Sequence, residues 1–378
     1  MAQRHHDLTD SAAGPAAPPV TGEALAGYLR GQATEFLRAL RLHRETGGGP
    51  NGSGGGTADA VDAARALRRS ARRISASLHT FRPLLDPGWS EEIRPELAWL
   101  SGTLALEHAC ESRLDRLLLA LHRLSGATTV PTQALGTGTG AGTAVSATAA
   151  AAATTATTQR TAPRPSPDRA NLTVGAAKAG ALLDRQLTLA RTRAHSTALQ
   201  ALGSSRFHAV ADKVAVLASE VPLAPHAATT DPRPLAAAAE ERLTDAVAAL
   251  PLVTAGHPYN AEALIHGLSP DPAPHPQDAP WHQVRLLLRL HRYALEVLHG
   301  DDAPLGVRLL SAGQALDRHR DASEAATAAA QAARTPRIAP ATAYALGVLH
   351  ADQRHEVEAS RYAFQRSWQK QTIGTGTS

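Results

Sequence analysis

The chain has 378 residues, of which 43% are hydrophobic and only 3% aromatic, so its core must be built mainly from Leu, Ala and Val. The single cysteine, Cys110, excludes an internal disulfide framework and a zinc site made of several cysteines. The net charge of +4 is a mild bias toward anionic partners and identifies none of them. Ala and Leu lead the helix propensities and strand-like runs are scarce, so the composition predicts an all-α protein.

The ends of the chain and one internal tract are unlike the rest in composition. The first residues lack the apolar core of a signal peptide, and no apolar run approaches the roughly 18 residues of a membrane span. We therefore expect a cytoplasmic protein with no membrane association. Residues 1–20 and 371–378 are expected to be disordered, and the Thr/Ala/Gly-rich insert 126–171 is expected to loop out.

Apolar residues at helical spacing, separated by Pro and Gly, predict a series of helices. The predicted architecture is all-α, with two antiparallel bundles in tandem at about 21–200 and about 203–370. Five aromatic residues are expected in the core: Phe207, Trp281, Tyr344, Phe364 and Trp368. The helices are predicted at Gly22 to Arg44, Ala58 to Phe81, Glu91 to Leu124, from near Val174, after Arg206, from Pro232-Arg233-Pro234 to about Leu250, Pro280 to Glu296, Pro304 to Ala333 and Pro340 to Trp368.

The helix predicted from Pro280 to Glu296 carries a regular row of cations. At about 100° per residue, its four basic positions fall within an arc of about 80°. Leu and Val cover much of the remaining circumference, so this helix is expected to be buried on several sides with one positive stripe. The four residues are His282, Arg285, Arg289 and Arg292.

The helix predicted from Ala58 to Phe81 repeats this stripe with Arg65, Arg68 and Arg72, and Arg73 lies alongside. Two interpretations are open for both helices. The arginine stems could cover apolar surface while their heads stay in water. Alternatively, planar guanidinium groups one turn apart suit a ligand with repeating negative charges, such as a chain of phosphates.

The pattern of the Pro280 to Glu296 helix resembles the CHAD domain (conserved histidine α-helical domain). The family signature is a His, an Arg three residues later, a basic residue four further on and another Arg near the end of the helix. His282, Arg285, Arg289 and Arg292 stand at these positions. The resemblance covers about residues 21–370, apart from the insert.

The first half of the chain resembles the family less closely. We align the first half to the family pattern at Phe81 and the Arg-Pro-Leu-Leu-Asp turn that follows. In this alignment, Arg68, Arg72 and Arg73 stand at positions where the family has cations, and Arg65 stands at the position of the family histidine. A later Leu-Gly-x-x-Arg-Asp motif reads Leu-Ala-Leu-Glu-His-Ala at 104–109, without the acidic–basic pair. Its second-half counterpart at 316–321 keeps the Arg-Asp pair but lacks the Gly.

The resemblance implies two pseudosymmetric helical bundles whose basic residues line a groove that binds inorganic polyphosphate, in some members on polyphosphate granules. It implies a binding protein and not an enzyme, because no catalytic domain is visible beside it. No cofactor is expected, and no metal, because the spacing of the histidines lacks a metal-binding motif such as His-Glu-x-x-His. The residues that it implies for polyphosphate binding are Arg65, Arg68, Arg72, Arg73, His282, Arg285, Arg289 and Arg292.

Two rival functions remain open at this point. Nucleic acid is the natural rival anion, but aromatic residues for base stacking are few and are not interleaved with the cations, so no specific nucleic-acid binding is expected. The other rival is a helical adaptor or scaffold that kept the fold and lost polyphosphate binding. Divergence in the first half favours the adaptor, and the intact stripe in the second half favours polyphosphate.

Overall fold

The computed structural model describes residues 21–47, 56–126, 167–257, 275–300 and 306–369, and within these ranges the chain is all-α. The only strand-like pairing described there is an isolated bridge between Leu85 and Leu223. The predicted fold class is therefore confirmed. The helices are α1 (Gly22–Gly47), α2 (Gly56–Thr80), η1 (Arg82–Leu84), α3 (Pro87–Thr103), α4 (Leu106–Ser125), α5 (Pro167–Leu202), α6 (Ser205–Ser219), α7 (Arg233–Ala248), α8 (Leu252–Ala255), η2 (Pro276–Asp278), α10 (Ala279–His299), α11 (Val307–Ala333) and α12 (Pro340–Gln369).

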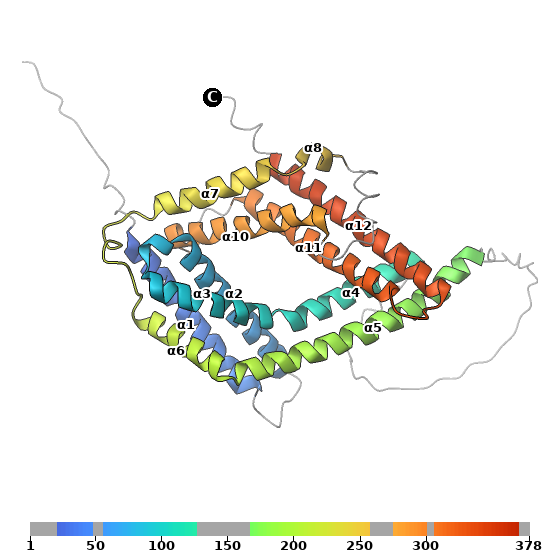
Figure 1. The fold of residues 1–378 in the computed structure, drawn as a ribbon, viewed down its shortest axis with the longest axis horizontal. Helices are drawn as coiled ribbons and strands as arrows, with labels where there is room; N and C mark the ends of the chain where they lie inside the picture. The colour runs from blue at the N-terminus through green and yellow to red at the C-terminus, as the bar shows by residue number, and fades with distance from the viewer. Residues whose placement is uncertain (1–20, 48–55, 127–166, 258–274, 301–305, 370–378) are drawn as a thin grey trace, which may run out of the picture.

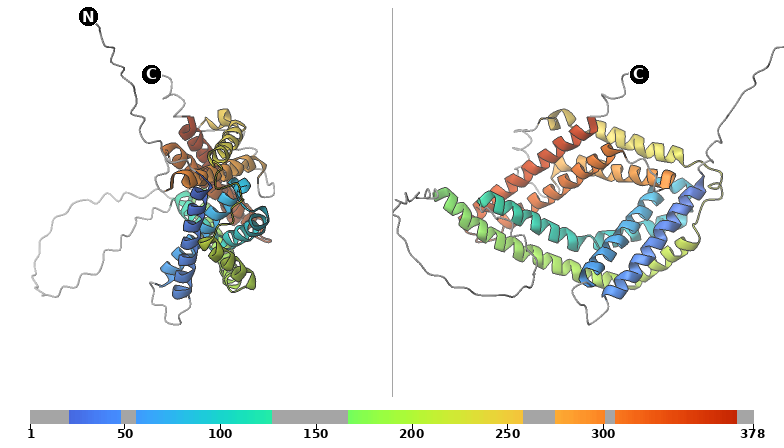
Figure 2. Two further views of the ribbon diagram at one scale, coloured as in Figure 1. Left: turned by 90° about the vertical axis from the view of Figure 1, so that its left-hand side faces the viewer. Right: turned by 180° about the vertical axis from the view of Figure 1, so that it is seen from behind.

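Long helices packed in pairs form the four sides of a quadrilateral (Figure 1). The pairs are α1 with α2, α4 with α5, α7 with α10, and α11 with α12. The first half of the chain supplies the first two sides and the second half supplies the other two, and the same arrangement is seen from behind (Figure 2). The corners close because α2 contacts α10 and α5 contacts α12.

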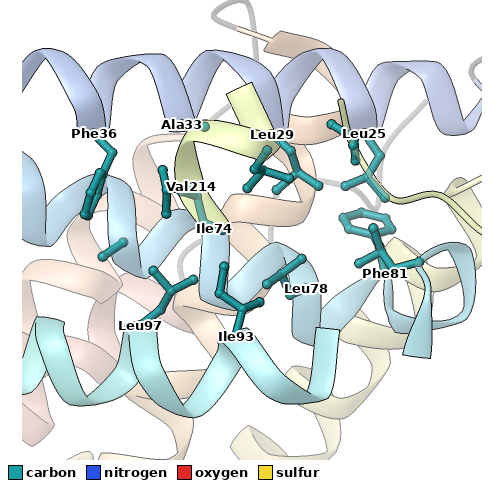
Figure 3. Close-up of a cluster of buried hydrophobic side chains, with 14 of the residues drawn as sticks. Leu25, Leu29, Ala33, Phe36, Ile74, Leu78, Phe81, Ile93, Leu97 and Val214 are labelled. Atoms are coloured by element: carbon teal, nitrogen blue, oxygen red, sulfur yellow. The ribbon is translucent and has the colours of Figure 1, made fainter. Parts of the chain in front are cut away.

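The largest apolar core lies where α1, α2, α3 and α6 meet (Figure 3). Leu25, Leu29 and Phe36 recur at helical spacing along α1 and are fully buried against Ile74 and Leu78 of α2. Removing such side chains from water stabilises the fold by roughly 1.5–3 kcal/mol each. This core fixes the position of α2 and therefore of its arginine row.

The two other cores hold the remaining sides together. One joins α4 and α5 to α11 and α12, and the other joins α7 and α10 to α11 and α12 around Trp281 and Phe364. Alanines dominate the buried face of α11, and small side chains let packed helices approach closely. Gly175 of α5 has the same role, because a Cβ there would lie 2.1 Å from the Ala341 carbonyl oxygen.

Two local predictions differ from the structure. The region predicted as one helix from Glu91 to Leu124 is two helices, which are separated at residues 104–105. The Pro87-Gly88 pair does more than end the preceding helix: it begins α3, because Pro is accommodated in a first helical turn and the Asp86 carboxylate accepts a hydrogen bond from the Trp89 N–H at 2.7 Å.

Of the five aromatic residues predicted to be in the core, four are buried or partly buried. Tyr344 is 62% exposed, so this prediction was wrong for it. Periodicity placed Tyr344 on the helix but could not show that α12 turns this position away from its neighbours.

The predicted boundary between the bundles falls between α5 and α6, and helices contact each other across it. Thus α6 packs on α1, and α5 packs on α12. The segments expected to be disordered, 1–20, 371–378 and most of the insert, lie outside the described residues. Among the helices that the structure describes, none combines the length and apolar character needed to cross a membrane.

Candidate functional site

The two arginine helices, α2 and α10, contact each other and direct part of their cations into one cavity. This central cavity has a volume of about 340 Å³, and α4 and α11 supply its other walls. The predicted residues Arg68, Arg72 and Arg285 line it. The remaining lining residues are Ala105, His108, Ala109, Ser112, Arg113, Arg116, Asp317, Arg320, Asp321 and Glu324.

Carboxylates on α11 neutralise three of the arginines of the central cavity. Asp317 pairs with Arg285 at 2.5 Å, and Glu324 pairs with Arg113 at 2.7 Å. The third acidic residue, Asp321, pairs with its neighbour Arg320 at 2.5 Å. These ion pairs neutralise the charges along the α11 wall of the cavity without a ligand.

The α2 wall is different, because Arg68 and Arg72 form no hydrogen bond or ion pair with any residue that the structure describes. Burial, followed by the nearby charges of Arg72 and Arg320, lowers the pKa of Arg68 to about 10. Burial also lowers the pKa of Arg72, and the Arg285 charge adds to this effect. Half-buried like charges without counter-ions disfavour the free state and favour an anion in the cavity.

A second cavity adjoins the first, and Arg72 lines both. This side pocket, between α2, α3 and α10, has a volume of about 380 Å³. It contains Arg289, whose pKa is lowered to about 10 by burial and then by the charges of Arg285 and Arg72. Its lining is Arg72, Ser75, Ala76, His79, Arg94, Ala98, Ser101, Leu286, Arg289, Leu290 and Tyr293.

Arg73, another predicted binding residue, lies in a partly buried interhelical contact and lines neither cavity. Its guanidinium donates to the two Glu296 carboxylate oxygens at 2.8 and 3.3 Å. The Tyr28 hydroxyl donates to the same carboxylate at 2.9 Å. Arg73 therefore links α2 to α10 and, through Glu296, to α1.

The other three predicted residues also lie outside the linings of the two cavities. Arg65 is exposed and pairs with Asp62 at 3.0 Å. Arg292 lies against α11, where a Cβ at Gly313 would be 3.8 Å from its Nη1. His282 packs edge-on against the His319 ring at 5.5 Å, and burial lowers its pKa.

Sequence reasoning missed three arginines of the central cavity as binding residues: Arg113, Arg116 and Arg320. Arg113 and Arg116 are three residues apart on α4, the same helical spacing that marked the other stripes, so a signal was present. Arg320 belongs to the Arg-Asp pair at 320–321. Its first-half counterpart, 104–109, contributes His108 to the opposite wall, so the two related motifs meet across the cavity.

A buried ionic cluster lies where η2, α11 and α12 meet. The Asp278 carboxylate is fully buried and accepts hydrogen bonds from Arg354 at 2.7 and 3.2 Å and from Arg361 at 2.7 Å. The Ser323 hydroxyl donates to it at 2.5 Å. Burial alone would raise the pKa of Asp278, but the hydrogen bonds and charge of Arg354 hold it well below its usual range.

His319, which is 1% exposed, completes this cluster. Its Nε2 accepts a hydrogen bond from Arg361 Nε at 3.3 Å, so the ring is neutral with its proton on Nδ1. Burial, followed by the Arg361 charge, lowers the pKa of His319 well below its usual value. The ring also stacks on Trp281, with the ring centroids 5.7 Å apart.

The buried neutral histidine predicts a loss of stability in weak acid. The unfolded chain binds a proton below about pH 6.5 that folded His319 does not bind, so the free energy of unfolding should fall as the pH drops through this value. Each such histidine contributes a slope of up to about 1.4 kcal/mol per pH unit. Urea unfolding between pH 8 and 5 should show a shallower slope for His319→Gln, which keeps an acceptor for Arg361. An unchanged slope would contradict the assignment.

Comparisons with known proteins identify the family to which this chain belongs. The family model of the CHAD domain matches residues 53–330, so the chain belongs to the CHAD domain family. The predicted resemblance is confirmed. No curated protein matches the chain.

Two solved structures are similar to the chain. PptA from Streptomyces chartreusis is 66% identical, with 93% of this chain and 100% of that chain covered and a TM-score of 0.70. The CHAD domain from the plant Ricinus communis is 16% identical, with 95% of this chain and 97% of that chain covered and a TM-score of 0.45.

Proposed function

We propose that this protein binds inorganic polyphosphate without catalysis, along a basic groove formed by α2 and α10. The observation that carries the proposal is the set of half-buried cations that lack counter-ions, Arg68, Arg72 and Arg289, beside Arg285. Membership of the CHAD family supports the same ligand. In this proposal the polyphosphate chain runs through the central cavity and passes Arg72 toward Arg289.

The chemistry of the groove suits a repeating anion. Each guanidinium can donate two parallel hydrogen bonds to a phosphate, and a linear polyphosphate presents a charged unit to each arginine in turn. Arg285 contributes when a phosphate displaces Asp317, a carboxylate that is itself 56% exposed and can turn to solvent. Arg65 at the rim, and Arg73, Arg292 and His282 behind the groove, would act on the ligand through their charge or by positioning α2 and α10.

The same proposal places the protein in the cytoplasm, associated with polyphosphate granules and not with membranes or specific nucleic acids. The rival adaptor function has one observation in its favour. The α11 carboxylates already neutralise Arg113, Arg285 and Arg320, as they would in a protein that no longer needs an anion there. Among the described residues, neither Arg68 nor Arg72 forms an ion pair with a carboxylate, which favours the binding protein.

Titration with long-chain polyphosphate at 50 and 200 mM salt tests this function. Binding should weaken steeply with salt, because each arginine that replaces a condensed counter-ion contributes roughly 0.7 to the slope of log K against log salt for a single-stranded polyanion. Four arginines that contact the ligand therefore predict a slope of log K against log salt of roughly −3. Single-stranded DNA serves as the competitor.

Three outcomes separate the candidate functions. Tight, salt-dependent polyphosphate binding that excess DNA does not displace supports the proposal. Equal affinity for DNA would make the groove a general anion surface. If no binding is detected at the lower salt concentration, polyphosphate binding is wrong and the adaptor function is favoured.

A further inference from the structure

The side pocket has an apolar portion that an inorganic polyanion cannot use. Ala76, Ala98, Leu286 and Leu290 line it beside Tyr293. Leu286 is 50% exposed although its helix is otherwise well packed. Polyphosphate carries no apolar surface, so it would gain nothing by covering these side chains. The pocket therefore fits a ligand with both an apolar body and a negative charge.

The charged portion of the side pocket is formed by Arg72 and Arg289, two guanidinium groups that have no hydrogen-bonded carboxylate among the described residues. The two groups are close enough that the charge of Arg72, after burial and the charge of Arg285, contributes to lowering the pKa of Arg289. A third cation, Arg94, is already paired with Glu91 at 3.3 Å. Two neighbouring unpaired guanidinium groups suit two linked phosphates better than a single carboxylate.

Polar side chains are interspersed with the apolar ones. The pocket lining includes the hydroxyl residues Ser75 and Ser101 and the imidazole of His79, whose Nδ1 lies 3.5 Å from Arg94 Nη2. A hydrocarbon chain would offer these groups no partner beyond those they already have, which are the Ala98 carbonyl oxygen for the Ser101 hydroxyl at 3.2 Å and Arg94 for His79. A heterocyclic ring and a sugar offer further donors and acceptors at their edges. The volume of about 380 Å³ is within the range of small-molecule sites, roughly 300–1,000 Å³.

We propose that the side pocket binds a nucleoside di- or triphosphate, with its base on the apolar wall around Leu286 and its phosphates on Arg72 and Arg289. This site does not depend on polyphosphate binding in the central cavity. Because Arg72 lines both cavities, a nucleotide and a polyphosphate chain would compete where both bind.

Calorimetric titration of the full chain with ATP, adenosine and tripolyphosphate tests the site. ATP should bind at least about ten-fold more tightly than tripolyphosphate, because it adds burial of an aromatic ring worth at least roughly 1.4 kcal/mol. Adenosine, which lacks the phosphates, should bind more weakly than ATP. Equal affinities for ATP and tripolyphosphate would overturn the proposal, because the pocket would then recognise phosphate alone.

The variant Leu286→Asn separates the apolar wall from the cations without changing the charge. It should weaken ATP binding about ten-fold and leave tripolyphosphate binding unchanged. The matched control is Leu199→Asn on α5, since Leu199 is 53% exposed and lies outside both cavities. Circular dichroism verifies that both variants fold.

Two results would overturn the nucleotide site: unchanged ATP affinity in Leu286→Asn, or equal losses for ATP and tripolyphosphate. Failure of the polyphosphate proposal looks different. In that case long-chain polyphosphate would not bind the unmodified protein, whereas ATP would still bind and respond to Leu286→Asn.

Discussion

The substitution Asp278→Asn should destabilise the protein by about 3–5 kcal/mol, the usual cost of removing one partner from a buried ion pair. The amide is nearly the same size as the carboxylate, so packing is preserved. The loss arises because Arg354, which is 2% exposed, keeps its charge without a paired counter-ion, and Arg361, which is 5% exposed, retains only Glu358 at 2.7 Å. Urea denaturation at pH 7 measures it as a lower transition midpoint.

An exposed pair gives the matched control for this experiment. Asp231 also forms an ion pair with an arginine, Arg233, at 2.7 Å, but on the surface of the protein. Exposed pairs contribute little to stability, so Asp231→Asn should leave the midpoint almost unchanged. Equal effects of the two substitutions would show that water enters the Asp278 cluster.

The same cluster sets the stability of the protein in strong acid. Because the folded state holds the pKa of Asp278 below its ordinary value of about 3.9, the contribution of this carboxylate is fully present above that pH. It is lost as the pH falls below about 4 and the unfolded chain takes up the proton. This window lies below the one expected for His319, so the two groups can be separated in one pH series.

The sequence was sufficient to predict most helices, because their signals are local. Leu and Ala at helical spacing mark the bodies of the helices, and Pro marks many of their ends. The α3 start shows the limit of this approach. Asp-Pro-Gly both ends one helix and begins the next, and the cap formed by Asp86 becomes visible only when the Trp89 N–H is placed.

The arginine stripes were also predictable, but their division into groove and scaffold was not. Arg72 and Arg73 are adjacent in the sequence, and only contacts with distant residues separate them. Arg73 finds the Glu296 carboxylate 223 residues away, whereas Arg72 finds no carboxylate and faces both cavities. Helical periodicity describes one helix at a time, so it cannot show which neighbour neutralises which cation.

The buried Asp278 cluster escaped prediction for a related reason. Asp278 lies at the end of a Pro-rich segment that is typical of an exposed loop. Its partners Arg354 and Arg361 are 76 and 83 residues further along the chain. A carboxylate is buried only when such partners enclose it, and no local pattern records that enclosure.

Replacing Arg68 and Arg72 together by Gln should nearly abolish polyphosphate binding and slightly stabilise the free protein. Hydrogen bonds to charged groups contribute roughly 1.5–3 kcal/mol each, so losing two predicts a loss of at least about 3 kcal/mol, or more than about 100-fold in affinity. The slope of log K against log salt should also become less negative by roughly 1.4.

Arg68→Gln/Arg72→Gln should stabilise the free protein because it removes unpaired charges, whereas Asp278→Asn destabilises it by creating them. In the free protein these two guanidinium groups are half-buried near Arg320 and Arg285 without counter-ions, and their lowered pKa values reflect burial and then this repulsion. Water screens much of the repulsion, so we expect a gain of only about 1 kcal/mol, a typical effect of relieving strain at a binding site. Urea denaturation without ligand measures the gain.

Arg41→Gln combined with Arg69→Gln is the control with the same change in net charge. Both residues are exposed, on α1 and α2, and neither lines a cavity. If binding depends on the geometry of the groove, this control should lose only a few-fold in affinity and gain no stability. If both double variants lose affinity equally, the attraction comes from overall charge, and Arg68 and Arg72 form no specific site. If Arg68→Gln/Arg72→Gln instead unfolds the protein, the two arginines are needed to pack α2 against its neighbours. Their role would then be structural, and the proposal that they bind an anion would be contradicted.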